Sequence, residues 1–579
     1  MASYSSKRTW LLAAGVNLII LALILAATDM LYETNDDYAI ASRIVDGYAA
    51  VNFVNYYLCR ILVSLQALTS AWNVYVIFQI EASWFSFTCI TKMIMDRSTS
   101  SLITVFALAV ITLFAADHYC TIQFTKTSAV VLAAGFIVMA DSFIYDNGIV
   151  YYVISVLLLY TGAALRADGL LPAIAYAGLY VIWWLIACRN DDKGKHSGET
   201  KFLTSKRLGT FVILIVLTGG CFVFNHMSYI ANTKGEELSR YKAYSEARSS
   251  VVDFGVYDRY DENAAKYDEI GISGNDLYLI DHWYFDYDGA AGLDNLEKIV
   301  DIDASSRDKG SSTAAAAKSA VKSFIKHVIK AVRNLSFSGL HLILLFIIAV
   351  WMMLILKPRH ILYIFAVGGL TAALYIALYY MQRPAYRAFY IADISAAMWL
   401  MYAASVFYIK NDVSRNKAAI HSAVTAIAVI AALLMLVPMH SNCRDAYQTV
   451  QKKVMPAELA EYIENNDSDF FVFSTTEKKS SNDYIKPWKA PATAKDKNVM
   501  GTGSWGTMSP YVLGKLEAYG LTNPIKDLID NDNAYYIGNK RIGRLEEYYN
   551  KWYGGSKKNI HLEKVRKIGG YSIWKVISG

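Results

Sequence analysis

Long apolar blocks constrain the fold of this chain more than any other feature of its sequence. A membrane-crossing helix needs about 20 mostly apolar residues, and eleven segments approach that length. Only 18% of the residues are charged, against about 25% in water-soluble domains. The sequence therefore predicts an integral membrane protein with about eleven transmembrane helices. The predicted spans are 9–28, 73–95, 101–116, 127–142, 149–165, 170–188, 208–225, 337–356, 361–380, 389–409 and 418–438.

Lysine and arginine in the short loops predict the orientation of these spans, because such loops are cytoplasmic when they are basic. Basic residues gather before span one and after spans six, eight and ten. With an odd number of spans, all of these loops fall on one side. We interpret Leu11–Ala27 as an uncleaved first span, since it is long for a signal peptide and many spans follow. The sequence predicts a multi-pass protein of the plasma membrane with a cytoplasmic N-terminus and an extracytoplasmic C-terminal domain.

The polar regions define the expected domains. Residues 1–438 are predicted to form an all-α transmembrane domain with external loops 29–72 and 226–336, and residues 439–579 a soluble α/β domain. Within the latter, Asp469–Ser474 and Tyr571–Val576 have strand patterns and Ile542–Trp552 a helical one. The match of "GTGSWG" (501–506) to a dinucleotide-binding pattern lacks a convincing preceding strand, so we assign it to a turn.

Two amphipathic segments are expected to lie on the membrane surface. Asn52–Ser70 has apolar residues at helical spacing. A second segment places Lys318, Lys322, Lys326 and Lys330 at every fourth position, opposite an apolar face. We expect it to lie on anionic headgroups. Our hypothesis is that it holds an acceptor or donor lipid near a site.

Cysteines and net charge exclude some classes of site. The six cysteines include no CxxC pattern and no Cys/His cluster, which argues against a zinc site. Cys120 and Cys443 both fall in segments predicted to be outside; a disulfide and two free thiols are both open. A net charge of +6 indicates no nucleic-acid partner. No cofactor is expected, and a divalent metal is possible but not indicated.

The segment "YETNDDYAIASRIVDGYA" (32–49) places acidic residues directly after the first span. Carboxylates at a membrane edge are costly unless they are solvated, paired or used. In one interpretation Asn35 or Asp36 caps a helix that starts near Tyr38. In the other, Asp36 or Asp37 is a general base that takes a proton from an acceptor hydroxyl. In such a helix the two would differ by about 100° in facing, so only one would point at an acceptor.

This layout resembles the GT-C superfamily of membrane glycosyltransferases, which use lipid-linked sugar donors. Four features carry the resemblance: an acidic pair in the first external loop, an amphipathic helix, about eleven spans and an external C-terminal domain. "NDDYAIASRIVDGY" is similar to a group of bacterial polytopic proteins of this kind. Other similar pieces are "IQFTKTSA" (122–129), "LRADGLLP" (165–172) and "GISGNDLYLIDHWYFD" (271–286).

The resemblance implies an inverting transfer in which an external-loop aspartate deprotonates the acceptor. Asp36 and Asp37 match that position, and we favour Asp36 slightly. Many members carry a second acidic motif after the third span; here "ADHY" has His118 where a carboxylate often stands, which argues against a metal-assisted version. The candidate donor phosphate-binding residues are Lys126, Arg166, Arg383 and Arg387. The candidate acceptor- or sugar-binding residues are Glu33, Asp117, His118, Gln123, Asp276 and Trp283.

The expected function is therefore transfer of a sugar from a polyprenyl-phosphate donor to an envelope glycan or lipid on the outer face of the membrane. Two alternatives stay open. A lipid-linked-sugar transporter or flippase would carry charged residues deep within several spans, of which Glu81 is the clearest. A non-catalytic scaffold for envelope assembly would tolerate neutralisation of Asp36 and Asp37. For Asp276, Trp283 and their neighbours, the alternative to sugar binding is a polar loop packed by its aromatic residues.

Overall fold

The chain forms two compact units. The computed structural model describes residues 2–191, 205–310, 313–408, 415–477, 485–491, 497–555 and 559–579. The first unit contains residues 1–229, 317–449 and 485–490, and the second contains residues 230–316, 450–484 and 491–579. The predicted basic loops after spans six and ten fall largely in 192–204 and 409–414, outside the described residues.

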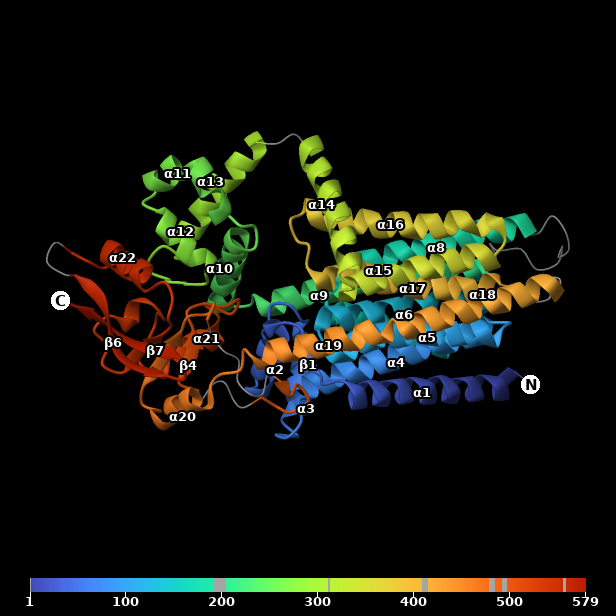
Figure 1. Ribbon diagram of the computed structural model, residues 1–579, viewed down its shortest axis with the longest axis horizontal. Helices are drawn as coiled ribbons and strands as arrows, with labels where there is room; N and C mark the ends of the chain where they lie inside the picture. The colour runs from blue at the N-terminus through green and yellow to red at the C-terminus, as the bar shows by residue number, and fades with distance from the viewer. Residues whose placement is uncertain are drawn as a thin grey trace. The chain divides into compact units, whose positions relative to one another are not determined.

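Long apolar helices dominate the first unit (Figure 1). In the described part of the chain, ten helices are long and apolar enough to cross a membrane. Helix α7, with 17 residues, is the short eleventh and matches the predicted span 149–165. The elements are α1 (Ala2–Ala27), β1 (Leu31–Tyr32), α2 (Asn35–Val45), α3 (Tyr56–Gln66), α4 (Val74–Arg97), α5 (Ser101–Cys120), β2 (Thr121–Ile122), α6 (Phe124–Tyr145), α7 (Ile149–Leu165), α8 (Leu170–Asp191), α9 (Ser205–Asn232), α14 (Thr313–Arg333), α15 (Phe337–Ile355), α16 (Ile361–Tyr380), α17 (Tyr386–Phe407), α18 (Arg415–Leu434) and α19 (Leu436–Gln451).

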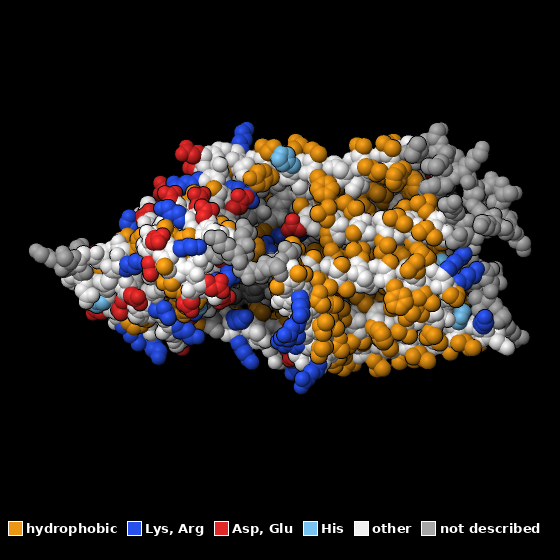
Figure 2. Space-filling model, turned by 90° about the horizontal axis from the view of Figure 1, so that it is seen from above, with side chains coloured by type: hydrophobic (Ala, Val, Ile, Leu, Met, Phe, Trp, Pro, Cys, Tyr) orange, Lys and Arg blue, Asp and Glu red, His pale blue; other side chains and the backbone are white. Residues whose placement is uncertain are grey.

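This architecture is that of a multi-pass membrane protein, as the apolar blocks predict. Helix α6 is buried along almost its whole length, and α17 is nearly as buried. The helices around them instead expose large apolar side chains such as Phe346, Leu362 and Phe365. Figure 2 shows such side chains covering the visible face of these long helices. Apolar surface of this extent is stable against lipid tails and unstable in water.

Helices α6 and α7 pack closely because glycines lie at their contact. A Cβ atom on Gly135 would lie 2.9 Å from Leu159, and one on Gly162 would lie 2.7 Å from Leu132. The Ser128 hydroxyl also donates to the Gly162 carbonyl oxygen, at 2.7 Å. Small residues at such contacts let helix backbones approach within a membrane.

The second unit is built on a five-stranded mixed sheet with strand order β4-β3-β5-β7-β6. Strand β3 pairs in parallel with β4 and β5, and β7 pairs antiparallel with β5 and β6. The elements are α10 (Glu236–Val252), α11 (Tyr260–Glu269), α12 (Gly274–Asp281), α13 (Leu293–Gly310), α20 (Ala457–Asn465), β3 (Phe470–Phe473), β4 (Val499–Gly501), α21 (Pro510–Glu517), β5 (Ala534–Ile537), α22 (Ile542–Trp552), β6 (Ile560–Ile568) and β7 (Tyr571–Ser578).

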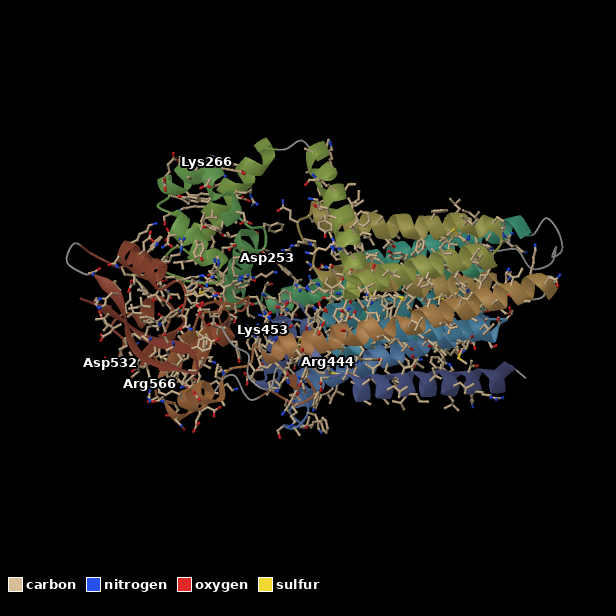
Figure 3. The ribbon with its side chains drawn as sticks, in the orientation of Figure 1. Asp253, Lys266, Arg444, Lys453, Asp532 and Arg566 are labelled. Atoms are coloured by element: carbon tan, nitrogen blue, oxygen red, sulfur yellow. The ribbon has the colours of Figure 1, made fainter. Side chains whose placement is uncertain are left out.

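Each face of this sheet carries its own core. Because successive strand residues point to opposite faces, Phe470 and Val472 lie in one cluster and Phe471 and Phe473 in the other. The first cluster also holds residues from α10, α12, α13, α21 and α22, and the second holds residues of α20. Exposed charged residues, including Asp253, Lys266 and Arg566, cover the outside of the unit (Figure 3).

The division of the chain differs from the predicted boundary at residue 438. Residues 230–316, predicted to be a loop of the transmembrane domain, belong with the C-terminal segment. The physical reason is that their apolar side chains, such as Leu277 and Ile280, complete the core on one face of the sheet. Residues 439–449 instead extend helix α19 and remain with the first unit.

The "GTGSWG" segment follows a short strand, β4, which the sequence did not predict, whereas its residues Trp505 and Gly506 lie in a turn, as predicted. Its Gly503 packs against neighbouring residues: a Cβ atom there would lie 2.3 Å from the Phe285 ring and 2.6 Å from the Trp283 carbonyl oxygen. The glycine therefore serves close packing within the second unit.

A buried ion pair fastens three helices at the end of the bundle away from the acidic motif. Arg97 at the end of α4 donates to both carboxylate oxygens of Asp141 on α6, at 2.7 and 2.8 Å. Tyr402 of α17 donates to Asp141 as well, at 2.6 Å. Asp141 is completely buried, so removing Arg97 would leave a charge without solvent or counter-ion.

We predict that Arg97→Ala lowers the stability of the protein by about 3–5 kcal/mol, as expected when one partner of a buried pair is removed. Thermal unfolding in detergent would measure the change. Lys242→Ala is the matched control, because it removes the exposed Lys242–Glu246 pair, worth about 0.5 kcal/mol. Equal effects of the two substitutions would contradict the prediction.

Candidate functional site

The acidic motif forms the first turn of helix α2, which begins at Asn35; Thr34 occupies the N-cap position without a side-chain capping hydrogen bond. The prediction that Asn35 or Asp36 caps a helix starting near Tyr38 is therefore wrong by three residues. The helix starts earlier than predicted because the extended backbone ends at Thr34. The Thr34 hydroxyl also donates to the Asp37 carboxylate at 3.5 Å. Both aspartates lie in the first turn, where the helix dipole favours negative charge.

Asp37 is completely buried and anchors α2 to the helix bundle. One of its oxygens, Oδ1, accepts hydrogen bonds from the Tyr75 hydroxyl at 2.9 Å and the Phe124 backbone N–H at 3.0 Å. The Gln79 amide donates to the same oxygen at 3.3 Å. Burial raises the pKa of the Asp37 carboxyl to about 8, against these hydrogen bonds, which lower it. Near neutral pH the group is therefore mostly protonated.

Asp36 differs from its neighbour in being accessible. Its side chain is 17% exposed, and one oxygen lies 3.9 Å from Nη2 of Arg387, which is itself 38% exposed. The two adjacent aspartates thus face different surroundings, as expected for neighbours on a helix. The pair of Asp36 and Arg387 places a carboxylate and a guanidinium within reach of an incoming molecule.

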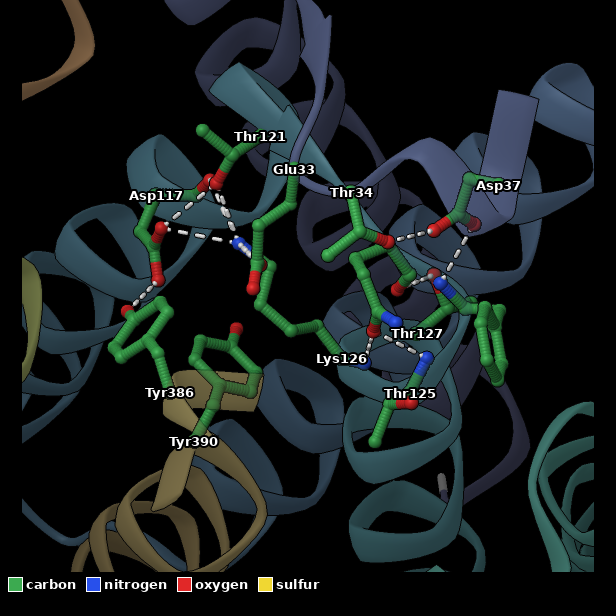
Figure 4. A network of polar contacts seen from close by, with 12 residues as sticks. Glu33, Thr34, Asp37, Asp117, Thr121, Thr125, Lys126, Thr127, Tyr386 and Tyr390 are labelled. Carbon is green, nitrogen blue, oxygen red and sulfur yellow. Dashed lines mark hydrogen bonds and ion pairs between the residues drawn. The ribbon is translucent and has the colours of Figure 1, made fainter. Parts of the chain in front are cut away.

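Behind this pair, Lys126 of α6 is completely buried between two carboxylates (Figure 4). Its ammonium lies 3.1 Å from Asp117 Oδ1 and 3.2 Å from Glu33 Oε2. It also donates to the Thr121 hydroxyl at 2.6 Å. The three donors of the ammonium are therefore engaged. This geometry favours a structural role for Lys126; its predicted binding to a donor phosphate remains untested.

Strands β1 and β2 bring these residues together. Leu31 and Tyr32 pair in parallel with Thr121 and Ile122, and the Glu33 N–H donates to the Ile122 carbonyl at 3.1 Å. This short ladder fixes Glu33 beside Lys126. Burial raises the pKa of the Glu33 carboxyl, and the Lys126 charge opposes that rise.

The network continues through residues that the sequence analysis did not single out. His341 of α15 is completely buried, with Nε2 lying 3.7 Å from Asp117 Oδ2 and Nδ1 lying 3.8 Å from Asp393 Oδ2. The Tyr375 hydroxyl contacts both oxygens of Asp393, at 2.9 Å. The sequence could have indicated Asp393, because it is a charged residue inside the apolar block 389–409. It could not have indicated His341, whose place beside Asp117 and Asp393 depends on how α15 packs against α5 and α17.

Asp117 and His118 lie within helix α5, which extends beyond the predicted span 101–116. The helix continues to Cys120, and both side chains are completely buried. His118 Nε2 lies 2.7 Å from the Ser83 hydroxyl. Asp117 also accepts a hydrogen bond from the Tyr386 hydroxyl. Both residues belong to the interior beneath the acidic motif.

Gln123 has a structural role at the start of α6. Its Oε1 accepts hydrogen bonds from the backbone N–H groups of Thr125 and Lys126, at 2.6 and 3.1 Å. Its buried Nε2 donates to none of the residues that the structure describes. Because Gln123 is completely buried, its contact with a sugar or acceptor stays a prediction.

The remaining predicted cations lie in different surroundings. Arg166 pairs with the exposed Asp168 at 2.6 Å and lies over the rings of Phe53 and Phe124. Arg383 is exposed in the turn between α16 and α17. Arg387, by contrast, lies 3.9 Å from the Asp36 carboxylate.

Asp276 and Trp283 belong to the second unit and serve its packing. Asp276 is completely buried. Ser273 caps α12, Asp276 completes the capping box by accepting from the Ser273 backbone N–H, and Asp276 also pairs with Lys551. Trp283 packs against Phe285, and the Arg248 guanidinium lies 5.2 Å from its ring centroid. The arrangement favours the alternative of an aromatic-packed structural segment, and the predicted sugar binding by these two residues remains untested.

Helix α14 presents three different faces around its axis. Phe324 and His327 pack against the rings of Tyr375 and Phe389. The exposed apolar residues Val321, Ile325 and Ile329 form a stripe on the next sector. The exposed Lys318, Lys322, Lys326 and Lys330 follow on the third. A helix with one apolar and one basic exposed sector is typical of the boundary between lipid tails and headgroups.

Known proteins offer no guide to this site. Comparisons with protein-family models, curated proteins and solved structures found no match for the chain. No group of three or more His, Cys, Asp or Glu side chains that could hold a metal ion occurs among the described residues.

We predict that Asp37 makes stability depend on pH. Its pKa is about 8 in the folded protein against 3.8 in an exposed carboxyl. Between these values the folded state binds more protons than the unfolded state, so the free energy of unfolding falls as pH rises. Asp37→Asn removes that titration. From about pH 5 to about pH 8, the melting temperature of the wild type should fall relative to that of the variant; parallel curves would contradict this.

We also predict that the lysines of α14 retain anionic lipid. Each lysine near an anionic surface contributes about 1 kcal/mol, so changing all four to Gln should reduce co-purified anionic phospholipid several-fold. Lipid analysis of the purified protein measures this. A control variant with Lys266, Lys298, Lys564 and Lys567 changed to Gln removes the same charge from the second unit. Equal lipid content in both variants would refute the prediction.

Proposed function

We propose that the protein is a membrane glycosyltransferase of the GT-C type. It would move a sugar, with inversion, from a polyprenyl-phosphate donor to an envelope glycan or lipid on the outer face of the membrane. The observation that carries the proposal is the juxtaposition of Asp36 and Arg387 beside the buried Lys126 network.

In this proposal Asp36 is the general base. It is the accessible member of the acidic pair, whereas Asp37 is buried and its pKa of about 8 keeps it mostly protonated. A base must be ionised to accept a proton from the acceptor hydroxyl. The environment of the two carboxyls therefore favours Asp36 and gives Asp37 the role of holding the first turn of α2 in place.

Arg387 would stabilise the phosphate that leaves with the polyprenyl chain. The planar guanidinium suits phosphate oxygens, and its partial exposure lets it exchange Asp36 for a ligand. As the phosphate gains negative charge during transfer, a fixed cation lowers the barrier most at the transition state. The unused Nε2 donor of Gln123 is a candidate contact for a sugar hydroxyl.

The transporter alternative also has an observation in its favour. Asp117, His341 and Asp393 are completely buried on three different apolar helices, and Lys126 lies beside them. Ionisable groups in such positions are typical of ion and substrate pathways. Glu81, the residue that the sequence singled out for this alternative, is instead exposed on the outside of α4.

We predict that Asp36→Asn abolishes transfer and Asp37→Asn does not. Loss of a general base typically costs about 10²–10⁴-fold in rate, whereas Asn at position 37 imitates the protonated carboxyl. Wild type and both variants would be expressed at matched membrane levels in a strain lacking the gene, and envelope glycans compared by mass spectrometry.

Restoration of the missing sugar by the wild type and by Asp37→Asn, but not by Asp36→Asn, would support the proposal. Full restoration by both variants would refute it and favour a transporter or a scaffold. An assay in membrane vesicles separates these two, because a transporter moves the intact lipid-linked sugar across the bilayer without cleaving it.

A further inference from the structure

Two cysteines that are far apart in the sequence meet in the first unit. Cys120 is the last residue of α5 and Cys443 lies on α19, the last helix of that unit. Both side chains are buried and both carry free thiols in the structure. Neither belongs to the acidic site or its hydrogen-bond network.

The contacts of the two sulfur atoms place them side by side. The Cys443 thiol donates to the carbonyl oxygen of Ala116 at 3.9 Å. Ala116 lies one turn before Cys120, so its carbonyl is directed toward Cys120 along the helix. The Cys443 side chain also interacts with that of Cys120. The Cys120 thiol itself donates to the Asp29 carbonyl oxygen at 3.7 Å.

We propose that Cys120 and Cys443 are joined by a disulfide in the mature protein. The oxidant is the disulfide of another protein: one thiolate of the pair attacks a sulfur atom of that disulfide and forms a mixed disulfide, and the second thiolate then attacks the mixed disulfide and expels the partner's thiolate. One sulfur–sulfur bond forms and one breaks, two electrons pass to the partner, and the partner leaves as a dithiol with two protons. The exchange takes place during folding, before the sulfur atoms are buried.

The predicted topology supplies the compartment for this reaction. Both cysteines fall in segments expected on the outer side, where disulfides form and persist. Thiols kept on the cytoplasmic side would stay reduced. The proposal is independent of the glycosyltransferase activity, and its test also reports on the orientation of the chain.

The disulfide would fasten α19 to the part of α5 that carries the network. Asp117 lies three residues before Cys120, and Thr121, which bonds the Lys126 ammonium, follows it directly. The bond closes a loop of about 320 residues, and cross-links of long loops restrict the unfolded chain most. Cys120 would thereby be a positioning residue for the end of α5.

Differential alkylation of the purified full-length protein tests the proposal directly. The protein is denatured and alkylated without reductant, then reduced, treated with a second alkylating reagent and analysed by peptide mass spectrometry. We expect Cys120 and Cys443 to carry only the second label, and the other buried thiols, Cys59, Cys89 and Cys221, to carry the first. First-label modification of Cys120 and Cys443 in most molecules would overturn the proposal.

Stability of serine variants gives a second, independent measurement. If the bond exists, Cys120→Ser, Cys443→Ser and the double variant lose the same interaction, so each lowers the melting temperature equally, by about 3 °C or more. Two thiols that merely pack together would each lose only part of their contacts on substitution, so the single effects would be smaller and the double variant would be less stable than either single variant. A double variant clearly less stable than both single variants would count against the disulfide.

Discussion

The first unit depends on the need to neutralise one buried charge. Lys126 lies on the most buried helix of the bundle and is completely excluded from solvent. An ammonium in such a place is stable only when opposite charges and hydrogen-bond acceptors surround it. Glu33, which follows β1, and Asp117 and Thr121, at the junction of α5 and β2, meet that need from two segments of the chain. The positions of those segments are therefore linked.

The need to neutralise Lys126 also determines how β1 and α2 lie at the edge of the helix bundle. Glu33 reaches Lys126 because β1 pairs with β2, and the same pairing places α2 directly after it. Asp37 then completes the attachment by accepting hydrogen bonds from α4 and from the start of α6. The segment Leu31–Val45 is thus held at two points. Asp36 lies between them on a rigid turn, with its carboxylate directed to the side of Arg387.

The division of labour between adjacent carboxyls gives the proposed mechanism its physical basis. Two identical side chains, one peptide apart, differ because one is desolvated and the other is not. Desolvation disfavours the ionised form, so the buried carboxyl suits a structural role and the accessible one suits proton transfer. The buried His341 and Asp393 extend the polar interior toward α15, α16 and α17, although neither ring nitrogen of His341 makes a hydrogen bond with the residues that the structure describes.

By itself, the sequence determined the membrane class, the positions of the apolar helices and several elements of the sheet unit, including α22 and β7. These follow from local periodicity and from the length of hydrocarbon that a helix must cross. The acidic turn and the accessible cations were also visible as exceptions within or beside apolar blocks. The allocation of residues 230–316 to the sheet unit was not, because their apolar residues show burial without showing the partner.

Only the tertiary structure decided which of Asp36 and Asp37 is buried, that Lys126 is surrounded by carboxylates, and that His341 lies between Asp117 and Asp393. Each of these facts depends on contacts between helices that are distant in the sequence, such as α2 with α4 or α5 with α15. Residue spacing fixes which side chains share a face of one helix. It cannot fix which face of another helix they meet, and that meeting sets the solvation, and with it the charge state, of every ionisable group in the site.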